Sequence, residues 1–236
     1  MSTEKQSYRD LKRKVLAVLR SDNFGQRLND LCHLPARQVI NPLFSFLLST
    51  DERIRWRAVT AMGAVVTNLA DEDMESARVI MRRLMWSLND ESGGIGWGAP
   101  EAMGEIIASH EGLAKGYASV LISYVSEEGN FLEYEMLQRG AVWGVGRVAQ
   151  ARPELVQDAL HYLLPQLTSA DATLRGLAAW TMGLLGAEAA RSQLEALLGD
   201  NAEISLYLDR TLVCRRVSHL AKKALDGIDG KGELLP

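Results

Sequence analysis

Hydrophobic positions recur along this chain in four copies of one helical pattern. Each copy ends on a glycine, and these glycines are Gly63, Gly104, Gly146 and Gly183. Nine, five and one residues before each glycine, and two residues after it, stands an aliphatic residue, an alanine or a methionine. At about 100° per residue, these offsets fall together on one side of a helix. The pattern therefore predicts four helices that each bury one apolar stripe.

The spacing of the copies predicts how these helices are arranged. The four glycines lie 41, 42 and 37 residues apart, and apolar segments suited to a second helix precede each copy. A period near 40 residues is typical of helical solenoids, in which each repeat is a pair of antiparallel helices. A fifth pair is predicted at 187–198 and 206–225. The fold class is therefore predicted to be all-α, a right-handed α-α superhelix of about five helix pairs.

A continuous repeat of this kind needs no internal domain boundary. We therefore expect a single domain over residues 1–236. Within it, residues 1–34 form N-terminal capping helices, residues 35–226 form the helix pairs, and residues 227–236 form a tail.

The side of the repeat helices opposite the apolar stripe carries the candidate binding residues. Seven and three residues before the motif glycines, the chain places four of its five tryptophans, one carboxylate and one guanidinium. These residues are Trp56, Trp97, Glu101, Arg139, Trp143 and Trp180. Large aromatic side chains away from a core stripe are uncommon on the surface of a protein without a partner.

Two interpretations of this side remain open. In one, the tryptophans and the glycine backbone line a concave groove that holds a protein or peptide partner, or a small planar ligand. The indoles then act as anchors, and Glu101 and Arg139 set the polarity. In the other, the glycines and tryptophans fill the seams between neighbouring repeats.

Composition narrows the range of functions. The formal net charge is −4, with 26 Lys and Arg against 30 Asp and Glu, so nucleic acid is a less favoured partner and an anionic membrane is not expected. Cys32 and Cys214 stand far apart, and the four histidines are scattered without a catalytic or metal-ligand spacing. The N-terminus has no apolar signal core, and no apolar run is long enough to span a membrane. We expect a cytoplasmic binding protein without cofactor or metal, and leave open whether it has catalytic activity.

The repeat motif itself resembles a known family. The segments RAVTAMG, GAPEAMG and RGLAAWTMG, with paired helices at this period, are similar to the HEAT-like repeats of the phycobilisome-lyase type. The resemblance extends from about residue 35 to residue 225. It implies a stack of helix pairs, and it implies a scaffold more directly than any particular chemistry.

A second resemblance suggests an alternative function. DNA alkylation-repair glycosylases built on HEAT-like repeats have a similar length and a concave cleft with tryptophans, a carboxylate and an arginine. The matching groups here are Trp97, Glu101, Arg139 and Trp180. By this resemblance the indoles would stack on a damaged nucleotide, Arg139 would contact phosphate, and Glu101 would stabilise the cationic sugar.

Overall fold

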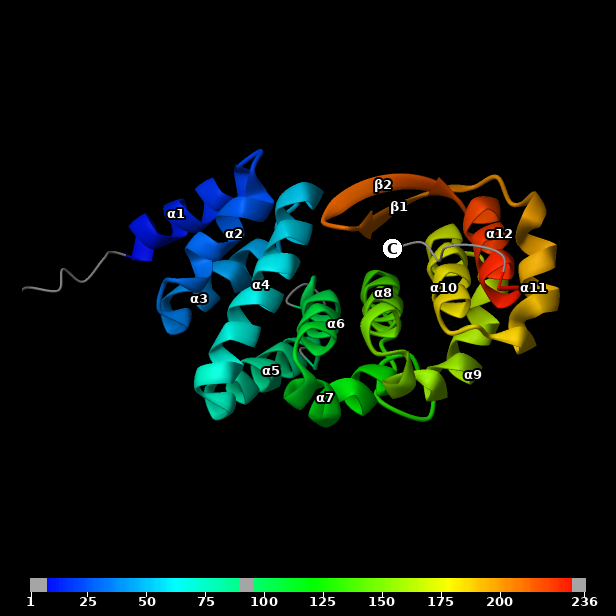
Figure 1. Ribbon diagram of the computed structural model, residues 1–236, viewed down its shortest axis with the longest axis horizontal. Coiled ribbons are helices and arrows are strands. Elements are labelled where there is room, and N and C mark those ends of the chain that lie inside the picture. The colour runs from blue at the N-terminus through cyan, green and yellow to red at the C-terminus, as the bar shows by residue number, and fades with distance from the viewer. Residues whose placement is uncertain (1–7, 90–95, 231–236) are drawn as a thin grey trace, which may run out of the picture.

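The computed structural model describes residues 8–89 and 96–230. In this part of the chain, twelve α-helices and one two-stranded antiparallel sheet form a curved row (Figure 1). The all-α superhelical stack expected from the repeat is confirmed, with a β-hairpin added to it. The tail residues 231–236 and the pattern residue 95 lie outside the described residues.

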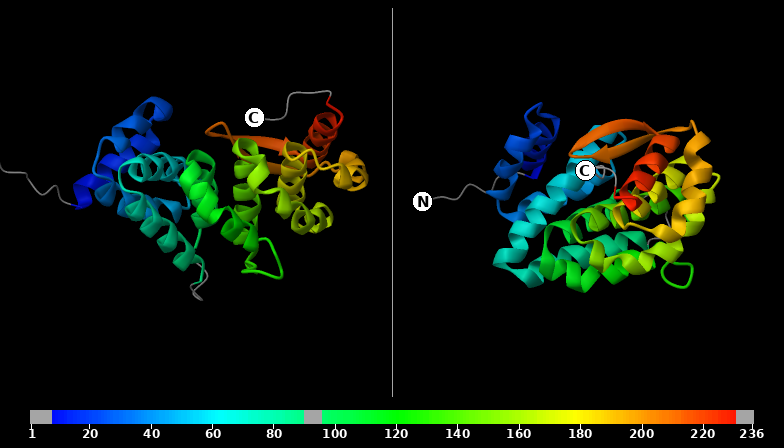
Figure 2. Two further views of the ribbon diagram at one scale, coloured as in Figure 1. Left: turned by 60° about the horizontal axis from the view of Figure 1, so that its bottom comes forward. Right: turned by 45° about the vertical axis from the view of Figure 1, so that its right-hand side comes forward.

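The helices form two layers. The inner layer is α4 (Glu52–Glu72), α6 (Ala99–Ser109), α8 (Glu135–Ala151), α10 (Ala172–Leu184) and α12 (Val217–Ile228). The outer layer is α3 (Ala36–Leu47), α5 (Met74–Leu88), α7 (Glu111–Ser123), the short α9 (Leu160–Leu163) and α11 (Arg191–Ala196). The first two helices, α1 (Tyr8–Arg20) and α2 (Phe24–Cys32), cover the N-terminal end. Consecutive inner helices lie side by side, and the outer helices pack behind them (Figures 1 and 2).

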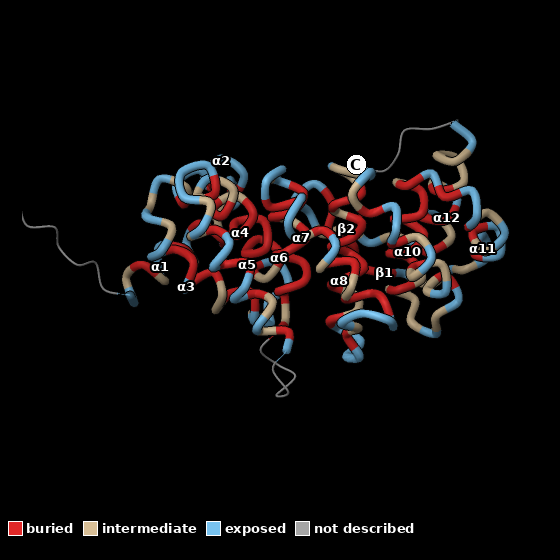
Figure 3. Tube along the Cα trace, turned by 90° about the horizontal axis from the view of Figure 1, so that it is seen from below, coloured by how far each residue is buried: buried red, intermediate tan, exposed pale blue. Residues whose placement is uncertain are grey.

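The apolar stripe forms the core. Each described residue at the four stripe offsets is at most 8% exposed, and Met62, Met103 and Ile106 are fully buried. The buried part of the chain follows the inner helices along the length of the molecule (Figure 3). Two of the inner helices begin where an aspartate caps them: Asp51 accepts a hydrogen bond from the Ile54 amide at 3.2 Å, and Asp171 from the Thr173 amide at 2.8 Å.

The four motif glycines allow the inner helices to approach one another closely. A Cβ atom built on Gly104 would lie 2.4 Å from the Cα of Gly144, on the next inner helix. One on Gly183 would lie 2.7 Å from the Cα of Ala224. At Gly63 and Gly146 the same atom would meet the side chains of the following inner helix. Of the two interpretations of these glycines, close packing between repeats is the one that the structure supports.

Two expected helices differ in the structure. Residues 153–167 are the apolar segment before the fourth copy of the pattern, where the paired-helix repeat predicts an outer helix. They form short 3-10 turns around α9, and Pro165 within them supplies no amide hydrogen for a regular helix. The helix expected at 206–225 is wrong in its first half. Residues 203–216 form the hairpin β1 (Glu203–Leu208) and β2 (Thr211–Arg216), paired antiparallel with Tyr207 opposite Leu212.

The hairpin follows from a local change of period. Ile204, Leu206 and Leu208 alternate along β1 with Ser205 and Tyr207, which is the period of a strand rather than of a helix. Its two-residue turn needs a left-handed backbone at both positions, and Asp209 (φ 44°) and Arg210 (φ 62°) adopt it.

Replacement of Gly104 by alanine tests the close helix contact. We expect Gly104→Ala to lower the free energy of unfolding by about 1–3 kcal/mol, since the new methyl group must displace the backbone of α8. Gly116→Ala on α7 is the matched control, because no atom lies within 4 Å of a Cβ there. This control should gain about 0.5–1 kcal/mol from its lower backbone entropy. Urea unfolding of both variants measures the difference, and equal stabilities would contradict the packing role.

Candidate functional site

The β-hairpin lies across the concave side of the inner helices. It leaves the C-terminal end of the row and reaches towards α4 (Figure 1). Ile204 packs on α10 at Gly176, where a Cβ atom would lie only 2.4 Å from the Ile204 side chain. The hairpin tip approaches α2, because a Cβ atom on Gly25 would lie 3.7 Å from a terminal nitrogen of Arg210. Much of the surface expected to be a groove is thus covered by the chain itself.

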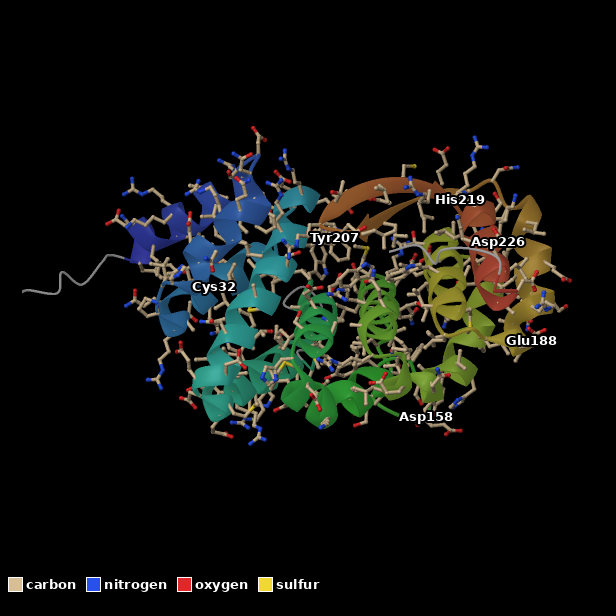
Figure 4. The ribbon with its side chains drawn as sticks, viewed as in Figure 1. Cys32, Asp158, Glu188, Tyr207, His219 and Asp226 are labelled. Carbon is tan, nitrogen blue, oxygen red and sulfur yellow. The ribbon has the colours of Figure 1, made fainter. Side chains whose placement is uncertain are left out.

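Tyr207 holds the hairpin on the inner helices (Figure 4). Its ring stacks on Trp56 of α4 with 4.8 Å between centroids and 13° between planes, and lies 6.3 Å from Trp143 of α8. Its hydroxyl and that of Thr60 share a hydrogen bond of 2.8 Å, and its carbonyl oxygen accepts one from the Trp143 indole at 3.0 Å. Burial raises the pKa of Tyr207 to about 12, so the phenol stays neutral and able to donate. One side chain therefore joins three segments that are far apart in sequence.

The predicted tryptophans lie on the expected side of the helices but under this cover. Trp56 is 9% exposed, and Trp143 and Trp180 are each 3% exposed. The Trp180 ring packs against the backbone of Gly146, and Trp97 is half-buried in the turn before α6. The expectation of an open row of indoles is therefore wrong, because Tyr207 and the repeat glycines occupy the space around three of them.

Glu101 is buried at the contact between α6 and α8. Its carboxyl group lies where a Cβ atom of Gly140 would be, and its Oε2 has no hydrogen-bond partner among the described residues. Burial raises the pKa of Glu101 to about 7, a shift that the nearby Arg55 only partly offsets. The carboxyl group is thus mostly protonated below neutral pH and is enclosed by the helices.

Arg139 is engaged in ion pairs at the start of α8. Its Nε lies 2.6 Å from Asp171, the capping residue of α10, and Glu135 pairs with the same guanidinium. Burial alone would raise the pKa of Asp171, but hydrogen bonds from Arg139 and the Thr173 amide hold it below its ordinary value. The structure therefore uses Arg139 to join two repeats, and does not place it with Glu101 in one open cleft.

An open polar trough remains beside the hairpin tip. It consists of two cavities of about 250 and 330 Å³, and both are lined by Thr60, Glu105 and Arg210. Trp143 and Trp180 border the first cavity, so two of the predicted site residues do reach this surface. The lining of the trough also includes Arg147, Gln150, Asn68 and Asp209. We refer to the two cavities together as the concave trough.

Charges in the concave trough are partly paired. Arg147 Nε donates to Glu105 at 2.7 Å, and both residues stand one position after a motif glycine on neighbouring helices. Opposite charges at the same repeat offset were a sequence signal for this pair. Arg210 is exposed and forms no hydrogen bond or ion pair with any residue that the structure describes. It is the cation of the trough that is open to a ligand.

Metal binding and membrane insertion are the two remaining features that the described residues can be compared with. Over residues 8–89 and 96–230, no group of three or more His, Cys, Asp or Glu side chains is placed to hold a metal ion. In the same ranges, no helix is long and apolar enough to cross a membrane.

Comparison with known proteins agrees with the paired helices. Residues 135–185, which include α8 and α10, match a family model described as HEAT-like repeat. This segment is therefore similar to a HEAT-like repeat. An uncharacterized protein of Archaeoglobus fulgidus is 27% identical over 178 residues, covering 73% of this chain and 87% of that protein.

Solved structures resemble the whole stack of helices. An engineered protein has a TM-score of 0.53 at 18% identity, covering 94% of this chain and 98% of its own. A designed armadillo repeat protein in complex with the peptide (KR)4 has a TM-score of 0.52 at 18% identity, covering 93% and 99%. Kap121p bound to Nup53p has a TM-score of 0.55 at 17% identity, covering 98% of this chain and 26% of that one. At these identities the likeness shows the fold, which is a HEAT- and armadillo-type repeat scaffold.

Substitution of Tyr207 tests its role in holding the hairpin. Tyr207→Phe should cost about 0.5–1.5 kcal/mol, because the buried Thr60 hydroxyl loses its partner. Tyr207→Ala should cost about 3–5 kcal/mol and release the hairpin from Trp56 and Trp143. Acrylamide quenching of tryptophan fluorescence should then increase in the alanine variant. The control is Tyr134→Ala, since that ring is 49% exposed; unchanged quenching in Tyr207→Ala would contradict the assignment.

The raised pKa of Glu101 predicts that the stability of the protein depends on pH. The pKa is about 7 in the folded chain and about 4.5 when unfolded, so the folded state binds the proton more tightly. The contribution of Glu101 to stability is fully present below pH 4.5 and is lost as the pH rises through 7. The shift corresponds to a loss on the order of 3 kcal/mol. Between pH 4.5 and 7, the free energy of unfolding measured with denaturant should fall more steeply in the wild type than in Glu101→Gln. Equal slopes in the two proteins would contradict the raised pKa of Glu101.

Proposed function

We propose that this protein is a non-enzymatic HEAT-like scaffold that binds a segment of a partner protein in the concave trough. The observation that carries the proposal is Arg210, an exposed cation that lines both cavities and has no ion-pair partner among residues 8–89 and 96–230. A segment lying along the trough would place one side chain in each cavity and a carboxylate on Arg210. Two cavities that share one cation give an extended segment two places for its side chains, which favours a peptide over a single planar ligand.

The backbone at Arg210 adds support. A left-handed conformation costs a residue with a side chain roughly 1–2 kcal/mol, and glycine would adopt it freely. Strained positions of this kind are concentrated at functional sites. The guanidinium gives a reason for arginine at this turn.

The similar structures are compatible with such a role. The designed armadillo protein holds the peptide (KR)4, and Kap121p is bound to Nup53p or to Pho4p. For this chain we infer a different chemistry, because the free cation of the trough calls for an acidic side chain. Glu101 is enclosed between helices and Arg139 is held in ion pairs, which favours binding over the glycosylase alternative.

Two adjacent glycine substitutions separate binding from folding. Arg210→Gly relieves the backbone strain at position 210 and removes the guanidinium. Asp209→Gly relieves the strain at the neighbouring position and keeps the guanidinium. We expect both variants to be at least as stable as the wild type. In selections from a displayed library of short peptides, the wild type should recover acidic peptides. Asp209→Gly removes a carboxylate from the trough lining and should bind these peptides at least as tightly. Their affinity for Arg210→Gly should be about tenfold lower, the effect of losing one charge-assisted hydrogen bond.

Two outcomes of the same selection would reject this function. Peptides that bind Arg210→Gly as tightly as the wild type would place the binding site elsewhere. Recovery of no peptide by either protein would equally count against a peptide-binding trough.

A further inference from the structure

A second groove lies on the outer side of the N-terminal helices. It is formed by α1, α3 and α5, has a volume of about 630 Å³, and shares no lining residue with the concave trough. Its lining consists of Tyr8, Asn41, Phe44, Ser45, Leu48, Arg83, Trp86 and Ser87. We refer to it as the outer groove.

The outer groove collects exposed apolar side chains. Trp86 is 75% exposed, Tyr8 is 51% exposed and Leu48 is 40% exposed. Single exposed apolar residues are ordinary, but several that line one concave patch mark an interaction surface. Trp86 is the fifth tryptophan, the one that stands outside the repeat pattern.

The three helices that form the outer groove are strongly basic. Together α1, α3 and α5 contain nine Lys and Arg but only two acidic residues, Asp10 and Glu75, whereas the whole chain has a net charge of −4. Asp10 is paired with Arg13, and Glu75 with Arg78 and Arg82. Neither of these two carboxylates lines the groove.

Two cations at the groove are held by neutral groups. Arg83 donates to the Asn41 side-chain oxygen at 2.6 Å and lies 4.0 Å from the centre of the Phe44 ring. Lys12 donates to the groove residue Ser45 at 3.2 Å and lies 5.4 Å from the Phe46 ring. Neither forms an ion pair with a carboxylate that the structure describes. Both are positioned by aromatic rings and keep their charge available.

We propose that the outer groove docks an acidic amphipathic segment of a partner protein. Large apolar side chains of the segment pack between Trp86, Leu48 and Tyr8, and carboxylates beside them pair with Arg83 and Lys12. This arrangement has the usual anatomy of an interface, an apolar centre with a polar rim.

A peptide fits this surface better than a nucleic acid does. Binding to a phosphate backbone depends on several free cations, yet Arg83 is the one Lys or Arg among the lining residues of the groove. The aliphatic side chain of Leu48 also offers no stacking surface for a base.

Two matched peptide libraries test the proposal. Both contain short sequences rich in Leu and Phe, one with Asp and Glu and the other with Lys and Arg at the remaining positions. The wild type should recover binders from the acidic library only. Trp86→Ala should weaken them about thirtyfold, as expected for a central aromatic anchor, and Arg83→Gln about tenfold.

The control variant is Val79→Ala. Val79 lies on α5 and is 52% exposed, but it does not line the groove, so its removal should leave affinity unchanged. The substituted residues are exposed, so all three variants should fold, which circular dichroism verifies. Arg210→Gly should also leave this binding intact, which separates the outer groove from the concave trough.

Four results would overturn the proposal. These are recovery of binders from the basic library, recovery of none from either library, and acidic binders that Trp86→Ala retains at full affinity. The fourth is evidence that the outer groove binds a nucleic acid or a second copy of this chain instead of an acidic peptide. Binding of a single-stranded RNA oligonucleotide that Trp86→Ala abolishes would show a nucleic-acid site, and self-association lost in the same variant would show a second copy of this chain.

Discussion

The close approach of neighbouring inner helices is the constraint on which the rest of the structure depends. It is possible because glycine stands at the same position of four repeats, so that backbone meets backbone at Gly104 and Gly144 and at Gly183 and Ala224. A glycine inside a helix costs roughly 1 kcal/mol relative to alanine. Here that cost is offset by packing along the whole length of the stack.

The same close approach explains why the hairpin is needed. With the inner helices so near one another, the rings of Trp56 and Trp143 lie 4.6 Å apart although they belong to α4 and α8. Left open, these rings would expose a large apolar surface to water. Tyr207 covers these rings and forms hydrogen bonds with the Thr60 hydroxyl and the Trp143 indole. The hairpin, which comes from the C-terminal part of the chain, therefore completes the core of the N-terminal half. What remains of the concave surface is the polar trough at the hairpin tip.

Periodicity carried most of the fold prediction and only part of the site. The stripe residues are buried as expected, since an apolar side chain at a regular helical offset has one way to leave water. The side that carries Trp56, Trp143 and Trp180 was also correctly placed. Its exposure was not predictable, because the cover comes from a segment 64 residues after Trp143 that breaks the repeat. Its turn is Asp-Arg in place of the usual Asn-Gly, so the strongest local signal for a hairpin is absent.

The distribution of charge gives the two open surfaces different characters. The concave trough contains Glu105 paired with Arg147, the carboxylates of Asp71 and Asp209, and Arg210, which pairs with no residue that the structure describes. Electrostatics there can therefore select the position of one carboxylate but adds little general attraction. The outer groove lies on three helices that are basic within an acidic chain. Their combined charge attracts an acidic partner more strongly than the single guanidinium of Arg210 does. Because attraction between exposed charges fades beyond roughly 10 Å at moderate salt, a partner would be oriented by the basic helices only when it is already near them. Under the two proposals made above, the repeat scaffold would hold two acidic segments at once, one bound along the inner helices and one anchored on the outer helices by the exposed Trp86.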